Sequence, residues 1–188
     1  MRTAILAVLL YAFSARAGVV DRVAVVVGDQ VMTESEVDEE VRITEFENQE
    51  ALDLSAAKRR AAAERLVDQQ LIRNEMQLER FQAPASNGAA LLQDFRREDF
   101  PSEARFEAAL HQYGISQAQI EQHLVWQAAA LRFVDFRFRG PQPATAQSAN
   151  RSRPGAGPTG ASEDPQLDAW LKQARAQTHI EFKKEAFE

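Results

Sequence analysis

The sequence predicts a mainly α-helical protein, in which a helical module carries a small N-terminal β-hairpin joined by a C-terminal strand. Three observations predict this class. Apolar residues recur at helical spacing over most of residues 34–138. A β-branched run near the N-terminus precedes a Gly-Asp turn. Polar and apolar residues alternate over residues 179–182, close to the end of the chain, which is typical of a strand.

The first residues predict an export signal that precedes the fold. Arg2 provides a short basic start, an apolar run follows from residue 4 to 13, and Ala-Arg-Ala then stands before Gly18. About ten apolar residues are too few to cross roughly 30 Å of hydrocarbon as a helix, which disfavours a membrane anchor. We therefore expect residues 1–17 to be cleaved, leaving an exported, soluble chain that starts at Gly18.

Composition excludes several kinds of partner and site. Removal of Arg2 and Arg16 with the signal lowers the 22 basic residues to 20, against 28 acidic ones, so the net charge changes from −6 to −8. Such an acidic chain has no general attraction for nucleic acid or for an anionic bilayer. The sequence contains no cysteine, which excludes disulfides, a thiolate nucleophile and a thiolate metal site.

The hairpin is predicted by two apolar runs, at residues 23–27 and 30–32, on either side of Gly28-Asp29. Thr33 follows directly, and Glu36 stands three residues later, which is the pattern of a capping box at a helix start. The second strand should therefore run straight into the first helix.

Five amphipathic helices should then follow. Pro84 and Asn87-Gly88 interrupt the pattern after the second helix, Ser102 and Ser116 are typical N-caps, and Gly114 is a typical C-cap. We expect helices at residues 34–46, 56–80, 89–97, 103–113 and 117–138. Their expected inner faces are Val37, Val41 and Phe46; Ala63, Val67, Leu71, Leu78 and Phe81; Phe106 and Leu110; and Ile120, Leu124, Ala128, Leu131, Val134 and Phe138.

A stretch rich in Pro, Gly, Ser and Ala at residues 140–164 cannot form a core and predicts a flexible linker. The chain then resumes with Asp164 as an N-cap and Pro165 at the first helical position, and Leu167, Trp170, Leu171 and Ala174 share one face. A lone terminal strand at residues 179–182 needs a partner, and the other predicted strands lie at residues 23–32. The end of the chain should therefore return to its start.

The sequence offers little catalytic chemistry. His111, His123 and His179 stand on separate elements and match no metal-ligand spacing. The sequence contains no nucleophile elbow, no phosphate-binding loop after a strand and no calcium-loop spacing among its acidic residues. We expect no enzyme activity, no cofactor and no metal.

Several segments resemble, in the same order, the N-terminal chaperone domain of the SurA family of periplasmic proteins. They are VVDRVAVVVGDQVMTESEVDEEV, RLVDQQLIRNEMQ and FPSEARFEAALHQYGISQAQIEQHLVWQ, while LDAWLKQARAQTHIEF resembles the family's returning C-terminal segment. The resemblance covers roughly residues 19–138 and 165–183. It implies a periplasmic protein that takes part in protein folding and outer-membrane protein assembly.

In that family, parvulin-type prolyl isomerase domains sit between the long helix and the returning helix. Here only residues 140–164 stand there, and a domain needs at least about 50 residues. We therefore expect no isomerase activity. The resemblance implies a signal at residues 1–17, a chaperone module at 18–139, a linker at 140–164 in place of the isomerase domain, and a helix and strand at 165–188 that pack back on the module.

A holding chaperone needs apolar surface with a charged rim and no catalytic residue. Trp126 and Phe133 are seven residues apart and share a face outside the expected stripe of the long helix, so they are candidates to line a groove. The alternative is that this face packs against the helix of Trp170 or the second helix. The candidate client-binding residues are Phe95, Phe100, Tyr113, Trp126, Phe133 and Phe136, with Phe106 in the same region.

The favoured interpretation is an ATP-independent holding chaperone that binds unfolded exported or outer-membrane polypeptides in the periplasm, without nucleic acid, metal or stable membrane insertion. Two alternatives stay open. One is a non-catalytic envelope scaffold that keeps the fold and binds a single partner. The other is a degenerate isomerase-family protein that works with a separate isomerase. The amount of exposed apolar surface separates the first two, since a chaperone should expose several aromatic side chains in a groove.

Overall fold

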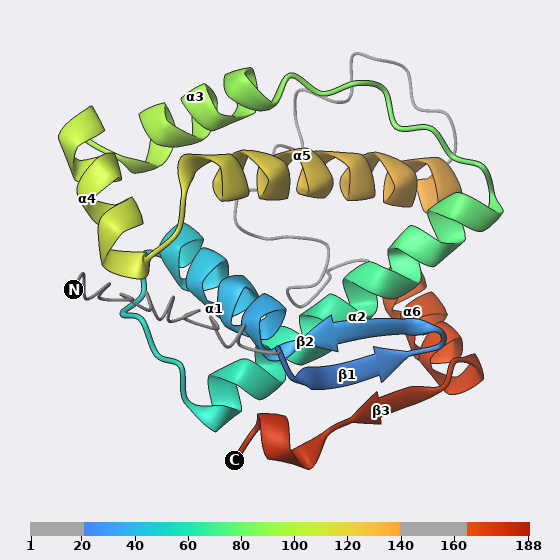
Figure 1. Ribbon diagram of the computed structural model, residues 1–188. Coiled ribbons are helices and arrows are strands. Elements are labelled where there is room, and N and C mark those ends of the chain that lie inside the picture. The colour runs from blue at the N-terminus through green and yellow to red at the C-terminus, as the bar shows by residue number, and fades with distance from the viewer. Residues whose placement is uncertain (1–20, 140–164) are drawn as a thin grey trace, which may run out of the picture.

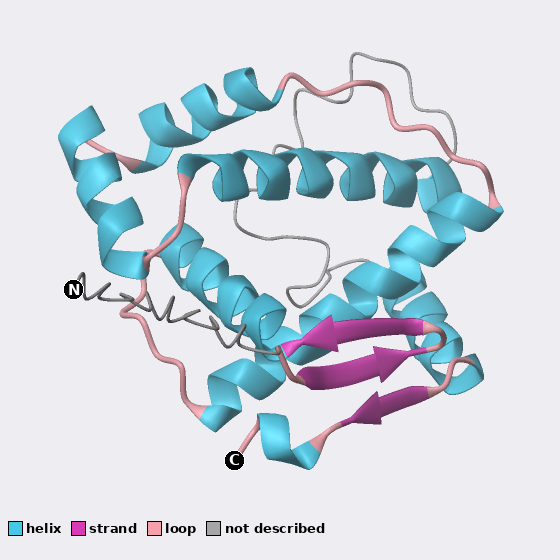
Figure 2. Ribbon diagram, in the orientation of Figure 1, coloured by secondary structure: helices cyan, strands magenta, loops and turns pink. Residues whose placement is uncertain are grey.

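The computed structural model describes residues 21–139 and 165–188 (Figure 1). Helices make up most of these residues, and three short strands form one small antiparallel sheet (Figure 2). The predicted mainly α class is therefore confirmed. The expected signal at residues 1–17 and the expected linker at 140–164, with its N-cap Asp164, lie outside the described residues.

The order of elements follows the sequence prediction closely. The predicted second helix ends two residues earlier than expected, and the long helix changes at Asp135 to a π-helical turn. The elements are β1 Val23–Val27, β2 Gln30–Thr33, α1 Glu34–Asn48, α2 Ala56–Leu78, α3 Gly88–Asp99, α4 Glu103–Tyr113, α5 Gln117–Val134, η1 Asp135–Arg139, α6 Pro165–Gln177, β3 Ile180–Phe182 and η2 Lys184–Ala186.

The sheet has the strand order β2-β1-β3, so the last strand lies beside the first one (Figure 1). β1 and β2 form the predicted hairpin, in which Val27 pairs with Gln30 and Gly28 takes a left-handed φ of 62°. β3 pairs with β1 in antiparallel register, with Val26 opposite Glu181. The predicted return of the chain end to its start is confirmed.

The predicted caps explain where the helices begin and end. Thr33 and Glu36 form the capping box of α1, and Ser116 forms a second one with Gln119 at the start of α5. Ser102 accepts a hydrogen bond at the start of α4. Gly114 ends that helix with a φ of 65°, a conformation that costs little only for glycine.

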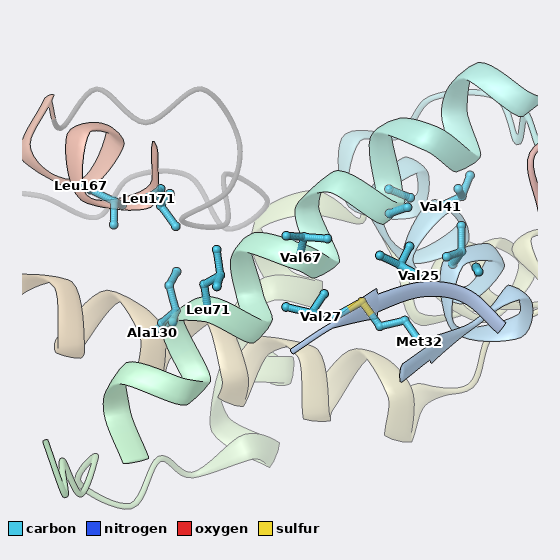
Figure 3. Packing of buried hydrophobic residues seen from close by; sticks show 14 of the residues in the cluster. Val25, Val27, Met32, Val41, Val67, Leu71, Ala130, Leu167 and Leu171 are labelled. Atoms are coloured by element: carbon cyan, nitrogen blue, oxygen red, sulfur yellow. The ribbon is translucent and has the colours of Figure 1, made fainter. Parts of the chain in front are cut away.

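Two apolar cores lie at opposite ends of α1 and α5. The first core joins the sheet to α2, the second half of α5 and α6, with Val25, Val27 and Met32 lying against Val67 of α2 (Figure 3). The second core joins the end of α1 to α3, α4 and the first half of α5. At its centre the Phe46 ring contacts the rings of Phe95, Phe100, Phe106 and Tyr113.

The structure corrects two expected inner-face residues. Leu78, the last residue of α2, is 78% exposed, and Leu131 of α5 is 43% exposed. Phe133 lies outside the expected apolar stripe of the long helix, yet it is 1% exposed and belongs to the first core. The reason is that α5 carries apolar residues on two faces, and the face with Ala130 and Phe133 meets the first core.

Polar contacts hold the returning segment in place. The Arg175 guanidinium of α6 donates to Asp68 at 2.7 Å and to the Glu64 carboxylate at 2.6 Å, both on α2. The Arg60 guanidinium, also on α2, lies 3.5 Å from the centroid of the Phe182 ring in β3. The C-terminal helix and strand are therefore both attached to α2.

Candidate functional site

A cavity of about 500 Å³ lies where β2, α1, α2 and α5 meet, and we call it the central cavity. Figure 1 shows α5 above the middle of the fold and β2 below it, with α1 to the left and α2 to the right. A second cavity of about 530 Å³, the outer cavity, lies between α3, α4 and the start of α5. The central cavity is lined by more side chains than the outer cavity, because it lies between elements that contribute to both cores.

The walls of the central cavity are partly apolar. Val31 and Met32 come from β2, Leu66 from α2 and Trp126 from α5. Val31 is 57% exposed, whereas Met32 is buried. The guanidinium of Arg73 lies 3.8 Å from the Trp126 ring centroid in a cation–π contact. Burial lowers the pKa of Arg73, and the negative charge of Glu40 opposes that shift.

The floor of this cavity is a buried polar network. Glu40 of α1 is 5% exposed, and its Oε1 accepts hydrogen bonds from Arg65 Nε at 3.1 Å and from Gln69 Nε2 at 3.2 Å. Arg65 Nη2 also donates to Thr44 Oγ1 at 2.9 Å. Each charged group here has a partner, so the network stabilises the packing of α1 on α2.

His123 belongs to a second polar group, which joins α5 to α1. Its Nε2 lies 3.5 Å from Glu47 Oε2, and Gln127 Nε2 donates to the same carboxylate oxygen at 3.2 Å. Burial lowers the pKa of His123, but the hydrogen bond and charge of Glu47, together with the charge of Glu40, outweigh burial and Arg65. The net result is a pKa above the ordinary value, so the pair favours the charged imidazolium.

The rim of the central cavity is acidic. Glu36 and Glu39 of α1 stand there, and Glu36 is also the capping-box residue. Arg73 is the guanidinium among the lining residues, and its face is occupied by Trp126. No group of three or more His, Cys, Asp or Glu that could hold a metal ion occurs in residues 21–139 and 165–188. Five of the fifteen lining residues are apolar or aromatic and ten are polar, five of them glutamines, so the cavity is a mainly polar surface with an apolar patch and a negative rim.

The structure does not bring the sequence-predicted aromatic residues into one groove. Phe95, Tyr113 and Phe133 are buried, with exposed fractions of 1%, 6% and 1%. Phe106 is also fully buried. The physical reason is that most of these rings pack around Phe46 in the second core, and Phe46 was not among the candidates.

Three candidates remain accessible, at separate places. Phe100 lines the outer cavity and Trp126 lines the central cavity. Phe136 is 56% exposed, and its ring lies 5.3 Å from that of Phe81. The Phe133 ring also contacts the Phe81 ring, which lies just after the end of α2. Phe133 therefore packs as in the alternative interpretation, in which the Trp126 and Phe133 face of the long helix meets the second helix.

Sequence reasoning missed most of the central cavity. Val31, Leu66, Arg73 and His123 come from three different elements, β2, α2 and α5, and no motif links them. One signal was available, since Val31 lies on the second, outer strand of the predicted hairpin. Nothing in the sequence indicated that α5 would pass close to that strand.

Comparison of the sequence with models of known protein families gives no match, and no curated protein matches it either. In the part of the chain that the structure describes, no helix is both long and apolar enough to cross a bilayer.

Proposed function

We propose that this protein is an ATP-independent holding chaperone that binds unfolded exported or outer-membrane polypeptides in the periplasm. The observation that supports the proposal best is the central cavity, which combines an apolar patch with a polar surround and an acidic rim. Such a surface suits transient binding of apolar side chains while its rim keeps it hydrated. The sequence resemblance to the SurA chaperone domain, and the signal-like residues 1–17, favour the same function and compartment.

The accessible side chains suit weak and tolerant binding. Trp126 offers an aromatic wall, one face of which is covered by the Arg73 guanidinium. Unfolded outer-membrane strands alternate apolar and polar residues, so one face of such a segment can meet the apolar wall. Tolerance of many sequences matters more here than affinity for one sequence.

A specific observation favours a second candidate, a non-catalytic envelope scaffold. The burial of Phe95, Tyr113 and Phe133 leaves less exposed aromatic surface than a broad chaperone groove would have. A scaffold that binds one folded partner needs only a compact patch.

Aggregation suppression tests the proposal. A urea-denatured outer-membrane β-barrel protein is diluted into buffer with the mature chain, and light scattering is followed. We expect suppression near stoichiometric amounts, and weaker suppression by Trp126→Ala. The matched control is Leu131→Ala, an exposed apolar truncation on the same helix outside the cavity. No suppression at several-fold excess of the wild type would refute the chaperone proposal and favour the scaffold.

A further inference from the structure

The two edges of the small sheet differ in how they are protected. β3 is three residues long, carries Glu181 with its partner Lys183 at 2.6 Å, and runs into η2. β2 at the other edge reads Gln-Val-Met-Thr and carries no charged side chain. Charged residues and very short strands are the usual protection of an edge against pairing with another chain. β2 is also short, at four residues, but it lacks the charged side chain that protects β3.

Hydrogen bonds of the sheet identify the free groups on β2. Gly28 N–H donates to His179 O at 2.8 Å, and Lys183 N–H donates to Ala24 O at 2.9 Å. The backbone N–H and C=O groups of even-numbered residues in β1 therefore point toward β3. Because the direction of the backbone N–H and C=O groups alternates along a strand, those of Val25 and Val27 point toward β2. Their partners there are Met32 and Gln30.

Val31 stands between these two partners, so its N–H and C=O point away from β1. Its neighbour on the same edge is already satisfied, since Thr33 N–H donates to the Glu36 carboxylate at 2.7 Å. No described residue supplies a partner to the outward groups of Val31, whose side chain is 57% exposed. The edge thus offers one donor and one acceptor at a single residue, beside the central cavity.

We propose that an extended segment of an unfolded polypeptide adds to β2 as a fourth strand, exchanging two backbone hydrogen bonds with Val31. This inference rests on the proposed function and names the part of the surface that binds the client. An added strand lies about 4.7–4.9 Å from β2, and its alternate side chains point to one face. Those side chains enter the central cavity between Met32, Leu66 and Trp126.

The charge of the cavity selects among extended segments. Glu36, Glu39 and Glu40 line it against Arg73 and His123. Glu40 is already paired with Arg65, and His123 is paired with Glu47. Glu36 accepts from Thr33 as the cap of α1 but keeps its charge, so Glu36 and Glu39 make the rim negative. The preferred occupant is an apolar or aromatic stretch flanked by lysine or arginine. Backbone pairing through one residue is weak and independent of sequence, which suits a chaperone that must release its client.

The direct test follows amide exchange at Val31 by NMR in the mature chain. The probe is a nine-residue alternating peptide of valine, phenylalanine and threonine with a lysine at each end. We expect the Val31 amide to exchange readily in the free chain and to become protected as the peptide saturates. The same peptide with N-methylated amides along one edge keeps its side chains, and it should bind about tenfold more weakly because backbone hydrogen bonds are lost. Glutamate in place of the lysines should also weaken binding.

Variants separate the edge from general apolar surface. Val31→Pro removes the outward N–H and leaves the hydrogen bonds of Gln30 and Met32 to β1 intact, since proline is tolerated on edge strands. Val31→Lys adds a charge to the edge, and Leu131→Lys makes the same change at an exposed apolar residue on α5. Peptide binding should fall with both Val31 variants and stay unchanged with the Leu131 control. If the proline variant does not fold, the lysine variant and the N-methylated peptide still decide.

Three results would overturn the inference. One is equal binding of the N-methylated and unmodified peptides. Another is a Val31 amide that is already protected without peptide, including protection that rises with protein concentration, which would mean that the chain itself or a second copy covers the edge. The third is unchanged peptide binding by Val31→Lys. Suppression of aggregation that survives these results would leave the proposed function standing, whereas protection of Val31 without suppression would refute the function and keep the strand addition.

Discussion

Replacing Arg175 by methionine tests whether the returning C-terminal segment is held by its contacts with α2. The guanidinium donates to Asp68 at 2.7 Å, to the Glu64 carboxylate at 2.6 Å and to the Glu64 carbonyl at 2.9 Å. The hydrogen bond to Asp68 makes the largest contribution to a pKa of Arg175 that is far above its ordinary value, so the side chain stays charged. Methionine keeps most of the aliphatic stem and removes all three hydrogen bonds.

The expected loss follows from the number and exposure of these contacts. Hydrogen bonds contribute about 0.5–1.5 kcal/mol each, and more when one partner is charged. The Arg175 and Glu64 side chains are 30% and 36% exposed, so solvent weakens their attraction and the lower part of that range applies. The sum is about 2 kcal/mol of unfolding free energy. For a chain of this size that lowers the melting temperature by about 4–8 °C.

Thermal unfolding followed by circular dichroism measures this loss, and amide exchange locates it. The Lys183 amide, which is bonded to Ala24 across the β1–β3 pair, should exchange faster in Arg175→Met. The matched control is Lys172→Met, an exposed position on the same helix, which should melt like the wild type. A variant that melts within a degree of the wild type, with unchanged exchange at Lys183, would refute the reasoning that these bonds attach α6 and β3.

Three further predictions concern the cores and the polar network. Phe46→Ala removes the ring at the centre of four aromatic contacts, so urea unfolding should show a loss of about 3–5 kcal/mol. Gly114→Ala should cost about 1 kcal/mol in the same assay, because φ is 65° and the new Cβ would lie 3.2 Å from Arg42 Nη1. His123→Gln should destabilise most at acid pH, because Glu47 raises the pKa of His123 in the folded state. The stabilisation by His123 is complete below its ordinary pKa of 6.5 and is lost as pH rises through the raised value.

Each of these predictions has a result that contradicts it. For Phe46→Ala, it is a urea midpoint equal to that of Leu131→Ala, a truncation of an exposed residue. For Gly114→Ala, a gain in stability would mean that the turn tolerates a side chain. For His123→Gln, the contradiction is a loss that is constant from pH 5 to 9; His111→Gln, at an exposed position, supplies the baseline.

Local signals made most of the fold predictable. Thr33 with Glu36, Ser116 with Gln119, and Gly114 act within a few residues, so the sequence alone places the ends of their helices. The β1–β3 pairing was also predictable, because a lone terminal strand must find a partner. These features depend on short-range chemistry or on simple elimination.

The site was much less predictable, because burial depends on which helices meet. Phe95 and Phe133 have the same apolar character in the sequence as Trp126, and only the packing around Phe46 and Phe81 separates buried rings from accessible ones. Leu131 shows the converse, since it continues a helical stripe but faces away from both cores. Helical periodicity identifies apolar faces, and it does not say which of two faces is covered.

The contact between Phe138 and Trp170 has a consequence for how the chain tolerates change. Their ring centroids lie 6.3 Å apart, so η1 and the first half of α6 are held together by the module itself. The entropy of closing a connection between two such fixed points grows only slowly, by about 0.6 kcal/mol for each doubling of its length. A whole domain with neighbouring termini could be spliced in at this point, or removed, with little effect on the module's stability.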